Sequence, residues 1–160
     1  MPAERYHVRV TKDAFIFSCG HFITFDRDKG ERLHGHNYRV AVEVEGPLDE
    51  NHYVFDFIAL RDRTQAICAE LDHHMLLATQ NPLLPVQVND RSVRVTFGDK
   101  EWVFPREDCV LLPIENTTAE LLAKWIAGRL LADLRGFAPE VVRVEVEENI
   151  GQSATYRWTV

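Results

Sequence analysis

The feature that most constrains the fold is an alternating segment that begins directly after two closely spaced histidines. Aromatic and valine side chains alternate with other residues across positions 38–45, which predicts a half-buried strand. His34 and His36 precede this segment and are separated by Gly35. If the strand extends back through the glycine, both imidazoles point to the same side, because side chains alternate along a strand. Two neutral imidazoles are two-thirds of a three-histidine zinc site that keeps a coordination position open.

Hydrophobic periodicity predicts an α+β fold with a four-stranded antiparallel sheet and two helices on one face. Length favours a single domain over residues 1–160. Between Pro82 and Pro113, short alternating segments separated by turn residues predict an inserted hairpin or small meander. The expected elements are a strand at 6–24 with a bend near Lys12 and Asp13, a strand at 37–45, a helix at 56–71, the insert at about 82–113, a helix from 117, and strands at 141–149 and 154–160.

Each predicted helix has a capping signal at its start. Asp56 predicts the N-cap of the first helix, and Phe57 begins the apolar stripe that we expect to face the sheet. Thr117 and Glu120 have the spacing of a capping box at the start of the second helix, and Gly136 predicts its end.

Composition excludes several classes of protein. The net charge of -7 argues against nucleic acid or an anionic membrane as the main partner. Three scattered cysteines are too few for a disulfide framework, which indicates a reducing cytosol. No stretch reads as a signal peptide or a membrane span. We therefore expect a cytoplasmic protein.

Two polar side chains end apolar strand faces. His21 follows Phe15, Phe17 and Cys19 at period two, an unusual position for an imidazole without a partner. Glu148 follows alternating valines in the same way, and a carboxylate there also needs a partner. His21 is thus a candidate for the third histidine ligand, and Glu148 could accept two parallel hydrogen bonds from a planar pair of donors.

Five motifs occur in an order that resembles the 6-pyruvoyltetrahydropterin synthase / 6-carboxytetrahydropterin synthase family. The resemblance covers most of the chain apart from the insert. It implies the tunnelling fold, in which subunits form barrels, usually as homohexamers with active sites between protomers. It also implies a lyase of folate or queuosine biosynthesis with a pterin triphosphate substrate. The motifs are Phe17-Ser18-Cys19-Gly20-His21, His34-Gly35-His36-Asn37-Tyr38, Phe55-Asp56-Phe57, Leu71-Asp72-His73 and Glu115-Asn116-Thr117-Thr118-Ala119-Glu120.

The resemblance assigns roles to individual residues. By it, the Zn²⁺ ligands are His21, His34 and His36, and the pterin-pocket segment includes Thr117, Thr118 and Glu120. Glu148 matches the family's pterin-anchoring glutamate, although Asn149 follows where the family often has threonine.

Asp72 and His73 match the family's aspartate–histidine couple. A carboxylate that orients an imidazole raises its basicity and fixes its tautomer, which provides a group for proton transfer near neutral pH. From the sequence alone, the adjacent His74 could take the same role.

The family's catalytic cysteine is missing, because Gly30 stands four residues before the first histidine of the pair. Glu31 lies beside the vacant position and resembles a subgroup in which glutamate replaces the cysteine. That subgroup cleaves 7,8-dihydroneopterin triphosphate to 6-hydroxymethyl-7,8-dihydropterin. Cys19 is a second candidate, as a base or an extra metal ligand. The alternative interpretation is that Cys19 is only a small, buried apolar residue of the core.

Three functions follow from these observations. The first is a zinc-dependent lyase that uses Glu31 to cleave the side chain of 7,8-dihydroneopterin triphosphate. The second is 6-carboxytetrahydropterin or 6-pyruvoyltetrahydropterin synthase activity with Cys19 or another base. The third is a non-catalytic homologue that binds zinc and a pterin.

Overall fold

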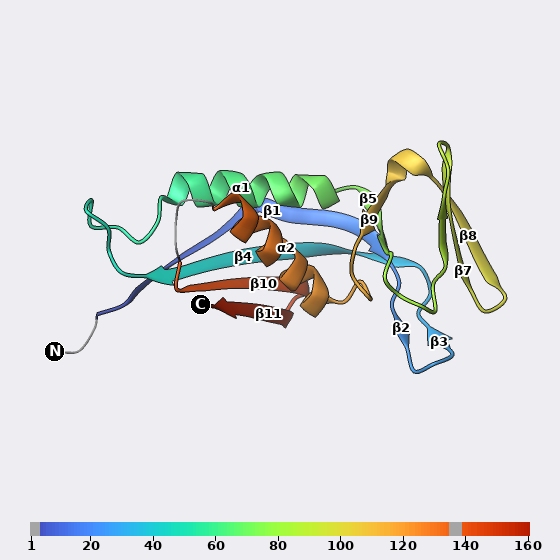
Figure 1. Ribbon diagram of the computed structural model, residues 1–160. Helices are drawn as coiled ribbons and strands as arrows, with labels where there is room; N and C mark the ends of the chain where they lie inside the picture. The colour runs from blue at the N-terminus through green and yellow to red at the C-terminus, as the bar shows by residue number, and fades with distance from the viewer. Residues whose placement is uncertain (1–3, 135–138) are drawn as a thin grey trace.

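The computed structural model describes residues 4–134 and 139–160, and its largest element is a six-stranded sheet (Figure 1). The strand order is β11-β10-β4-β1-β5-β9. Within the described residues the strands are β1 Tyr6–His21, β2 Thr24–Phe25, β3 Lys29–Gly30, β4 His34–Gly46, β5 His74–Ala78, β6 Val86–Val88, β7 Ser92–Phe97, β8 Lys100–Pro105, β9 Cys109–Leu112, β10 Val141–Asn149 and β11 Gln152–Thr159, and the helices are α1 Phe57–Leu71, η1 Arg106–Asp108 and α2 Ala119–Asp133.

The four long strands β11, β10, β4 and β1 pair antiparallel, which confirms the predicted sheet. The ladder between β1 and β4 shifts register between Thr11 and Ile16, at the predicted bend. Two short strands extend the sheet beyond the prediction. β5 pairs parallel with β1, and β9 pairs parallel with β5, so the complete sheet is mixed.

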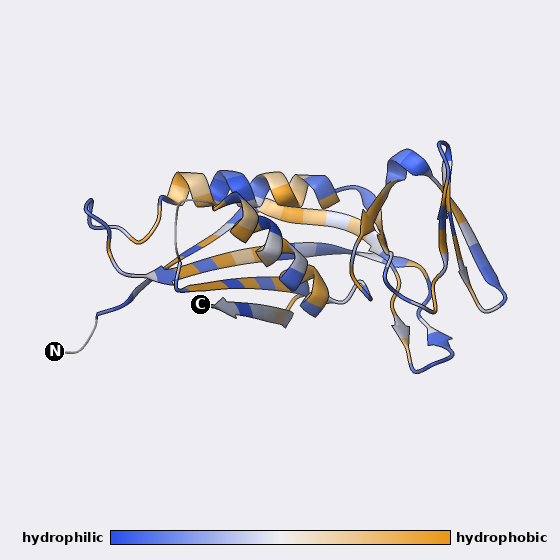
Figure 2. Ribbon diagram, in the orientation of Figure 1, coloured by the Kyte–Doolittle hydropathy of each residue, from blue (hydrophilic) through white to orange (hydrophobic). Residues whose placement is uncertain are grey.

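The two long helices pack on the sheet and share one core with it (Figure 2). Tyr38, Phe15 and Phe17 are completely buried beneath the helices, together with the alternating valines of β4 and β10. Burying such side chains contributes about 1.5–3 kcal/mol each. The inward faces of β1 and β4, predicted from period two, are therefore the inward faces observed.

The helix starts differ in part from the sequence prediction. The Asp56 side chain accepts a hydrogen bond from the amide of Ile58, so the predicted N-cap of α1 is confirmed. Phe57, however, is 56% exposed and does not belong to the inward stripe. Thr118 rather than Thr117 caps α2, with its hydroxyl accepting from the amide of Leu121. The predicted stop at Gly136 lies outside the described residues.

Within the predicted insert, β6, β7 and β8 form a separate three-stranded antiparallel sheet, whereas β9, at its end, belongs to the main sheet. The three-stranded sheet packs against the end of the main sheet through a second apolar cluster, in which the rings of Phe22 and Trp102 stack with centroids 4.6 Å apart. In Figure 1 it lies at one end of the molecule, close to the β2–β3 hairpin. The insert therefore packs beside the end of β1 where His21 lies.

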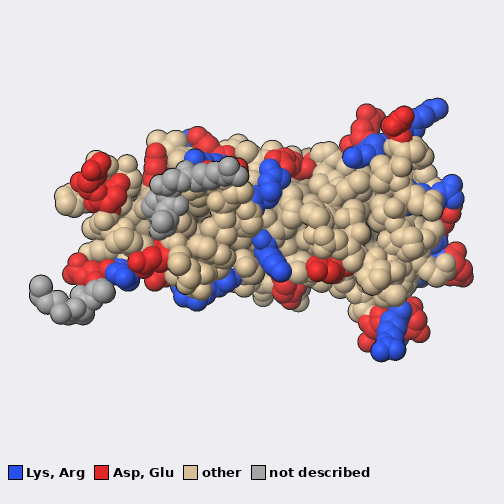
Figure 3. All heavy atoms as spheres, viewed as in Figure 1, with Lys and Arg blue, Asp and Glu red and all other residues tan. Residues whose placement is uncertain are grey.

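Charged side chains of both signs are interleaved over the visible face (Figure 3). At the β2–β3 hairpin, for example, Lys29 lies 2.9 Å from the carboxylate of Asp26. No helix within residues 4–134 and 139–160 is long and apolar enough to cross a membrane.

Candidate active site

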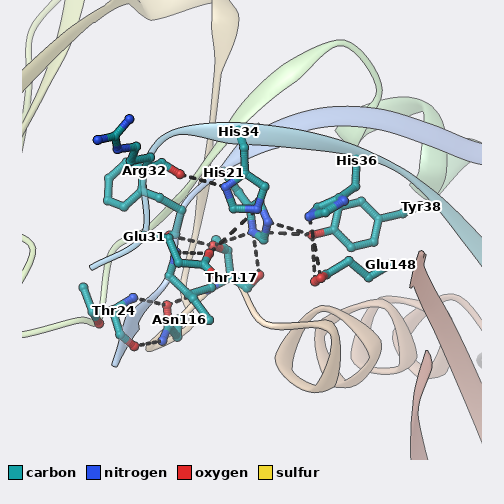
Figure 4. A network of polar contacts seen from close by, with 12 residues as sticks. His21, Thr24, Glu31, Arg32, His34, His36, Tyr38, Asn116, Thr117 and Glu148 are labelled. Carbon is teal, nitrogen blue, oxygen red and sulfur yellow. Dashed lines mark hydrogen bonds and ion pairs between the residues drawn. The ribbon is translucent and has the colours of Figure 1, made fainter. Parts of the chain in front are cut away.

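Three histidines from two neighbouring strands converge on one point (Figure 4). His21 ends β1, and His34 and His36 begin β4. The antiparallel register places His21 opposite His34, and Cys19 opposite His36. One nitrogen of each ring lies within 4.8 Å of a nitrogen of the other two. The prediction that these rings share one side of the sheet is confirmed.

Backbone carbonyls fix the orientation of two of the rings. His21 Nδ1 lies 3.0 Å from the carbonyl oxygen of Thr117, and His34 Nδ1 lies 2.7 Å from that of Arg32. A carbonyl can only accept, so Nδ1 of each of these two rings carries a proton. Burial lowers the pKa of His21, which keeps this ring neutral at pH 7. Neutral imidazoles held by an acceptor on the other nitrogen are typical of metal ligands.

The third ring has a nitrogen without a hydrogen bond. His36 Nε2 is the one buried side-chain nitrogen or oxygen in residues 4–134 and 139–160 that lacks a hydrogen-bond partner. Buried polar atoms in native proteins are nearly always satisfied, so an orphan of this kind suggests an absent ligand. The donor set therefore fits a metal ion that accepts three imidazole nitrogens.

A tyrosine and a glutamate lie beside the histidines. The Tyr38 hydroxyl lies 3.1 Å from His21 Nε2 and donates to a Glu148 carboxylate oxygen at 3.4 Å. Glu148 continues the alternating valine face of β10, so its half-buried side chain lies on the same side of the sheet as the histidines. The sequence prediction treated Tyr38 only as a core residue. Its position two residues after His36 on the same strand face was the available signal.

Glu31 also faces the cluster. Its carboxylate lies 3.8 Å from His34 Nε2 and accepts a hydrogen bond from the amide of Ile23 at 3.3 Å. A second bond, from the Glu31 amide to the carbonyl of Ile23, measures 2.9 Å. The structure thus places the predicted carboxylate next to the predicted metal ligands.

Cys19 lies on the same strand face but in different surroundings. The thiol is buried, and this burial, reinforced by Asp72 and Glu148, raises its pKa to about 12. A thiol with so high a pKa is protonated at neutral pH, whereas a thiolate is needed to act as base or nucleophile. The surroundings of Cys19 match those of an inert core residue.

His73, which Asp72 contacts, lines a second depression, separate from the one that Glu31 lines. The Asp72 carboxylate accepts from the Ser18 amide at 2.7 Å and lies 2.9 Å from His73 Nδ1. The Ser18 amide bond and the His73 interaction lower the pKa of Asp72. The His73 side chain is 82% exposed, while His74 is half-buried and bonds the Asp72 carbonyl instead. His73 is therefore the imidazole that the carboxylate orients.

Two depressions flank the histidines. One, of about 390 Å³, is lined by His21, Glu31, Thr118, Glu120 and Glu148 among others. The other, of about 380 Å³, is lined by Cys19, His36 and His73 among others. Of the segment predicted to form a pterin pocket, Thr118 and Glu120 line the first depression.

Thr117 has a role that the sequence prediction missed. It is buried, its hydroxyl donates to the carbonyl of Phe22, and its own carbonyl holds His21. Thr117 therefore supports a proposed metal ligand rather than lining the depression.

Comparisons with known proteins agree on one family. A family model described as 6-pyruvoyl tetrahydropterin synthase matches residues 9–158. A Methanocaldococcus jannaschii protein named "Putative 6-carboxy-5,6,7,8-tetrahydropterin synthase" is 34% identical over 145 residues, 88% of each chain. The Pyrococcus furiosus dihydroneopterin monophosphate aldolase is 35% identical over 120 residues, 75% of this chain and 73% of the relative.

Solved structures show the same relationship. The crystal structure of 6-pyruvoyl tetrahydropterin synthase from Plasmodium vivax superposes with a TM-score of 0.90 at 31% identity, covering 99% of this chain and 100% of that one. Two further structures of the Plasmodium vivax protein are described as catalytic-residue mutants, in which a glutamate is replaced by alanine or by cysteine.

Proposed function

Because the chain belongs to the 6-pyruvoyl tetrahydropterin synthase family, whose members act in pterin metabolism, we propose that it is a zinc-dependent lyase of 7,8-dihydroneopterin triphosphate. The products would be 6-hydroxymethyl-7,8-dihydropterin and a phosphorylated glycolaldehyde. The observation that carries the proposal is the Glu31 carboxylate, 3.8 Å from Nε2 of His34, in a chain with glycine at the cysteine position. Two relatives support it: an aldolase of dihydroneopterin monophosphate, which supports the cleavage reaction, and a synthase with a catalytic glutamate.

The proposed step is a retro-aldol cleavage between the two hydroxyl-bearing carbons of the side chain. Glu31 takes the proton of the hydroxyl farther from the ring, and that carbon becomes an aldehyde as the carbon–carbon bond breaks. The electron pair of the broken bond passes to the side-chain carbon attached to the pterin ring, and the ring stabilises this pair by conjugation. That carbon keeps its own hydroxyl and gains a proton, which yields the hydroxymethyl product. His73, oriented by Asp72, is the proposed proton carrier.

The other residues bind and orient the substrate. The Glu148 carboxylate would accept two hydrogen bonds from the amino group and adjacent N–H of the pterin ring. Thr118 and Glu120 would line the same pocket. Nitrogens of His21, His34 and His36 would hold Zn²⁺, which supplies a positive charge that lowers the pKa of a nearby hydroxyl.

We propose that active sites form between subunits of a homo-oligomer, with a hexamer expected. The exposed His73 and the Glu31 carboxylate line different depressions of one chain. No lysine or arginine of the described residues lines either depression, although a triphosphate needs cations. A neighbouring subunit that brings His73 and basic groups to the Glu31 depression would meet both needs. Sedimentation of the zinc-loaded protein tests this assembly.

A product analysis tests the proposed reaction. Zinc-loaded protein is incubated with 7,8-dihydroneopterin triphosphate, and in parallel with the monophosphate, and products are identified by mass spectrometry. We expect 6-hydroxymethyl-7,8-dihydropterin from the triphosphate, with turnover lost in Glu31→Ala and kept in Cys19→Ala. If only the monophosphate gave this product, the proposed cleavage reaction would stand, but the substrate would be the monophosphate instead of the triphosphate.

The second candidate is 6-carboxytetrahydropterin synthase activity, which the names of several archaeal relatives favour. A carboxy- or pyruvoyl-pterin product, abolished in Cys19→Ala, would establish it in place of the lyase. The third candidate is a homologue that binds zinc and pterin without turnover. Tight pterin binding by zinc-replete protein without conversion of any of these substrates would establish that alternative.

A further inference from the structure

The aromatic ring of Phe97, at the end of β7 in the insert, lies directly on Gly30. A Cβ atom added to residue 30 would lie 2.9 Å and 3.2 Å from two carbons of this ring. Packed carbon atoms approach to about 3.5–4.0 Å, so the ring leaves no room for a side chain there. With Phe97 in this position, residue 30 must be glycine.

The backbone beneath the ring belongs to the hairpin that carries Glu31. Gly30 pairs with Thr24 in the two-stranded β2–β3 ladder. Glu31 follows at once and is bound to Ile23 twice, by its amide at 2.9 Å and by its carboxylate at 3.3 Å. A shift of the hairpin would therefore move the carboxylate away from His34.

A residue just outside the insert holds the hairpin at a second point. Asn81, just before the insert, donates to the Thr24 hydroxyl at 2.9 Å. Phe97 itself packs on the apolar cluster that joins the insert to Phe22 and β5. Because Phe97 and Asn81 both lie outside the hairpin, their contacts with it can limit movement of a hairpin whose tip is exposed and charged.

We propose that Phe97 is a positioning residue, whose ring on Gly30 fixes the hairpin so that the Glu31 carboxylate stays beside the histidines. The inference rests on the proposed catalytic role of Glu31. It gives the insert a function, and it links the missing side chain at residue 30 to a residue of that insert.

The kinetic test compares Phe97→Ala, Gly30→Ala and the double variant, all zinc-loaded. A misplacement of about 1 Å can cost on the order of 100-fold in rate, so we expect each single variant to lose roughly 10- to 100-fold in kcat. KM should stay within about threefold, because pterin binding does not use these residues. The kcat of the double variant should exceed that of Gly30→Ala, since removing the ring makes room for the new methyl group.

Matched controls separate this effect from general damage. Val103→Ala removes an apolar side chain from the exposed side of the same insert, where Val103 is 54% exposed. Gly128→Ala adds a methyl group where nothing lies within 4 Å. Both should keep wild-type kcat. Phe97→Leu retains apolar volume and should give an intermediate kcat if Phe97→Ala proves unstable.

A second readout does not depend on turnover. Hydrogen exchange at the Ile23 and Glu31 amides should accelerate roughly tenfold in Phe97→Ala and stay unchanged in Val103→Ala, with zinc content equal in all variants. If wild type turns over and both Phe97→Ala and Gly30→Ala keep kcat within twofold, the positioning role is overturned while the proposed function stands. If wild type shows no turnover, faster exchange still supports the positioning of the carboxylate, and unchanged exchange overturns it.

Discussion

A Glu148 carboxylate oxygen lies 3.6 Å from His36 Nε2, the buried nitrogen without a hydrogen bond. The proposed pterin anchor and the proposed metal site are therefore immediate neighbours. The Tyr38 hydroxyl lies within hydrogen-bond distance of both Glu148 and His21. A substrate held by its ring at Glu148 would extend its side chain toward the histidines and Glu31, which is the arrangement that cleavage of that side chain requires.

Replacing Glu148 should weaken substrate binding. Glu148→Gln removes the charge that would accept two hydrogen bonds, each charge-assisted bond contributing about 1.5–3 kcal/mol. We expect kcat/KM to fall on the order of 10- to 1000-fold in steady-state assays. Glu147→Gln is the matched control, because its side chain alternates to the other face of β10. An equal loss in both variants would contradict a ring-binding role for Glu148.

Neutralising Glu31 should stop turnover without removing the metal. Glu31→Gln keeps the size and the acceptor for the Ile23 amide but cannot take a proton, and loss of a general base costs typically 10²- to 10⁴-fold. Zinc content, measured by plasma emission spectrometry, should stay equal to wild type. A large loss of zinc in this variant would instead make Glu31 a metal ligand.

Removing zinc should lower the melting temperature (Tm), because the bound ion stabilises only the folded state. A ligand present at 100 times its Kd stabilises the folded state by about 2.7 kcal/mol. Chelation should therefore lower the Tm of the wild type, and added Zn²⁺ should restore it. His34→Ala should show the lower Tm without chelator and no response to zinc, whereas His52→Ala, in an exposed turn, should behave as wild type.

Asp72 should make stability depend on pH in the acid range. The Ser18 amide and His73 lower its folded-state pKa below its unfolded-state value of about 3.9. The contribution of Asp72 to the free energy of unfolding is thus present above pH 4 and is lost as the pH falls through the folded-state pKa. The carboxylate is 37% exposed, so we expect Asp72→Asn to cost only about 0.2–1 kcal/mol at pH 6.

Urea unfolding at pH 6 and pH 3 checks this expectation. The difference between wild type and Asp72→Asn should shrink at pH 3, where the carboxylate is increasingly protonated. Asp13→Asn, at a carboxylate that is 98% exposed, is the control and should show little difference at either pH. If the difference in unfolding free energy between wild type and Asp72→Asn were larger at pH 3 than at pH 6, the result would contradict a lowered pKa for Asp72.

The two neighbouring threonines should separate by phenotype. Thr118→Ala removes the N-cap of α2 and should cost about 1 kcal/mol in denaturant unfolding. Thr117→Val removes the hydroxyl beside His21 but leaves the cap and the carbonyl that His21 bonds. We expect it to lower zinc affinity more than Thr118→Ala does, as measured by competition with a chromogenic chelator.

The sequence predicts the long strands and the histidine cluster because both follow from period two. Once Tyr38 and the valines of β4 face the core, His34 and His36 must share that side, and the stripe ending in His21 meets them across one ladder. Glu148 follows from the same rule on β10. These predictions need only local patterns and one antiparallel pairing.

The strands β5 and β9 could not be read in this way. Residues 75–78 are all buried, so they show no alternation, and a short continuous apolar run fits a buried parallel strand or part of a helix equally. Likewise, Thr117 and Thr118 both satisfy a cap by type. Only the contact with His21, far away in the sequence, shows which of them holds that histidine.

The packing of Phe97 on Gly30 has an evolutionary consequence. A mutation that introduced cysteine at residue 30 would meet the ring, so its effect depends on whether Phe97 has changed first. Two substitutions distant in the chain are thus epistatic. A cysteine at residue 30 would therefore require a change at Phe97, in the insert, as well as at Gly30 itself.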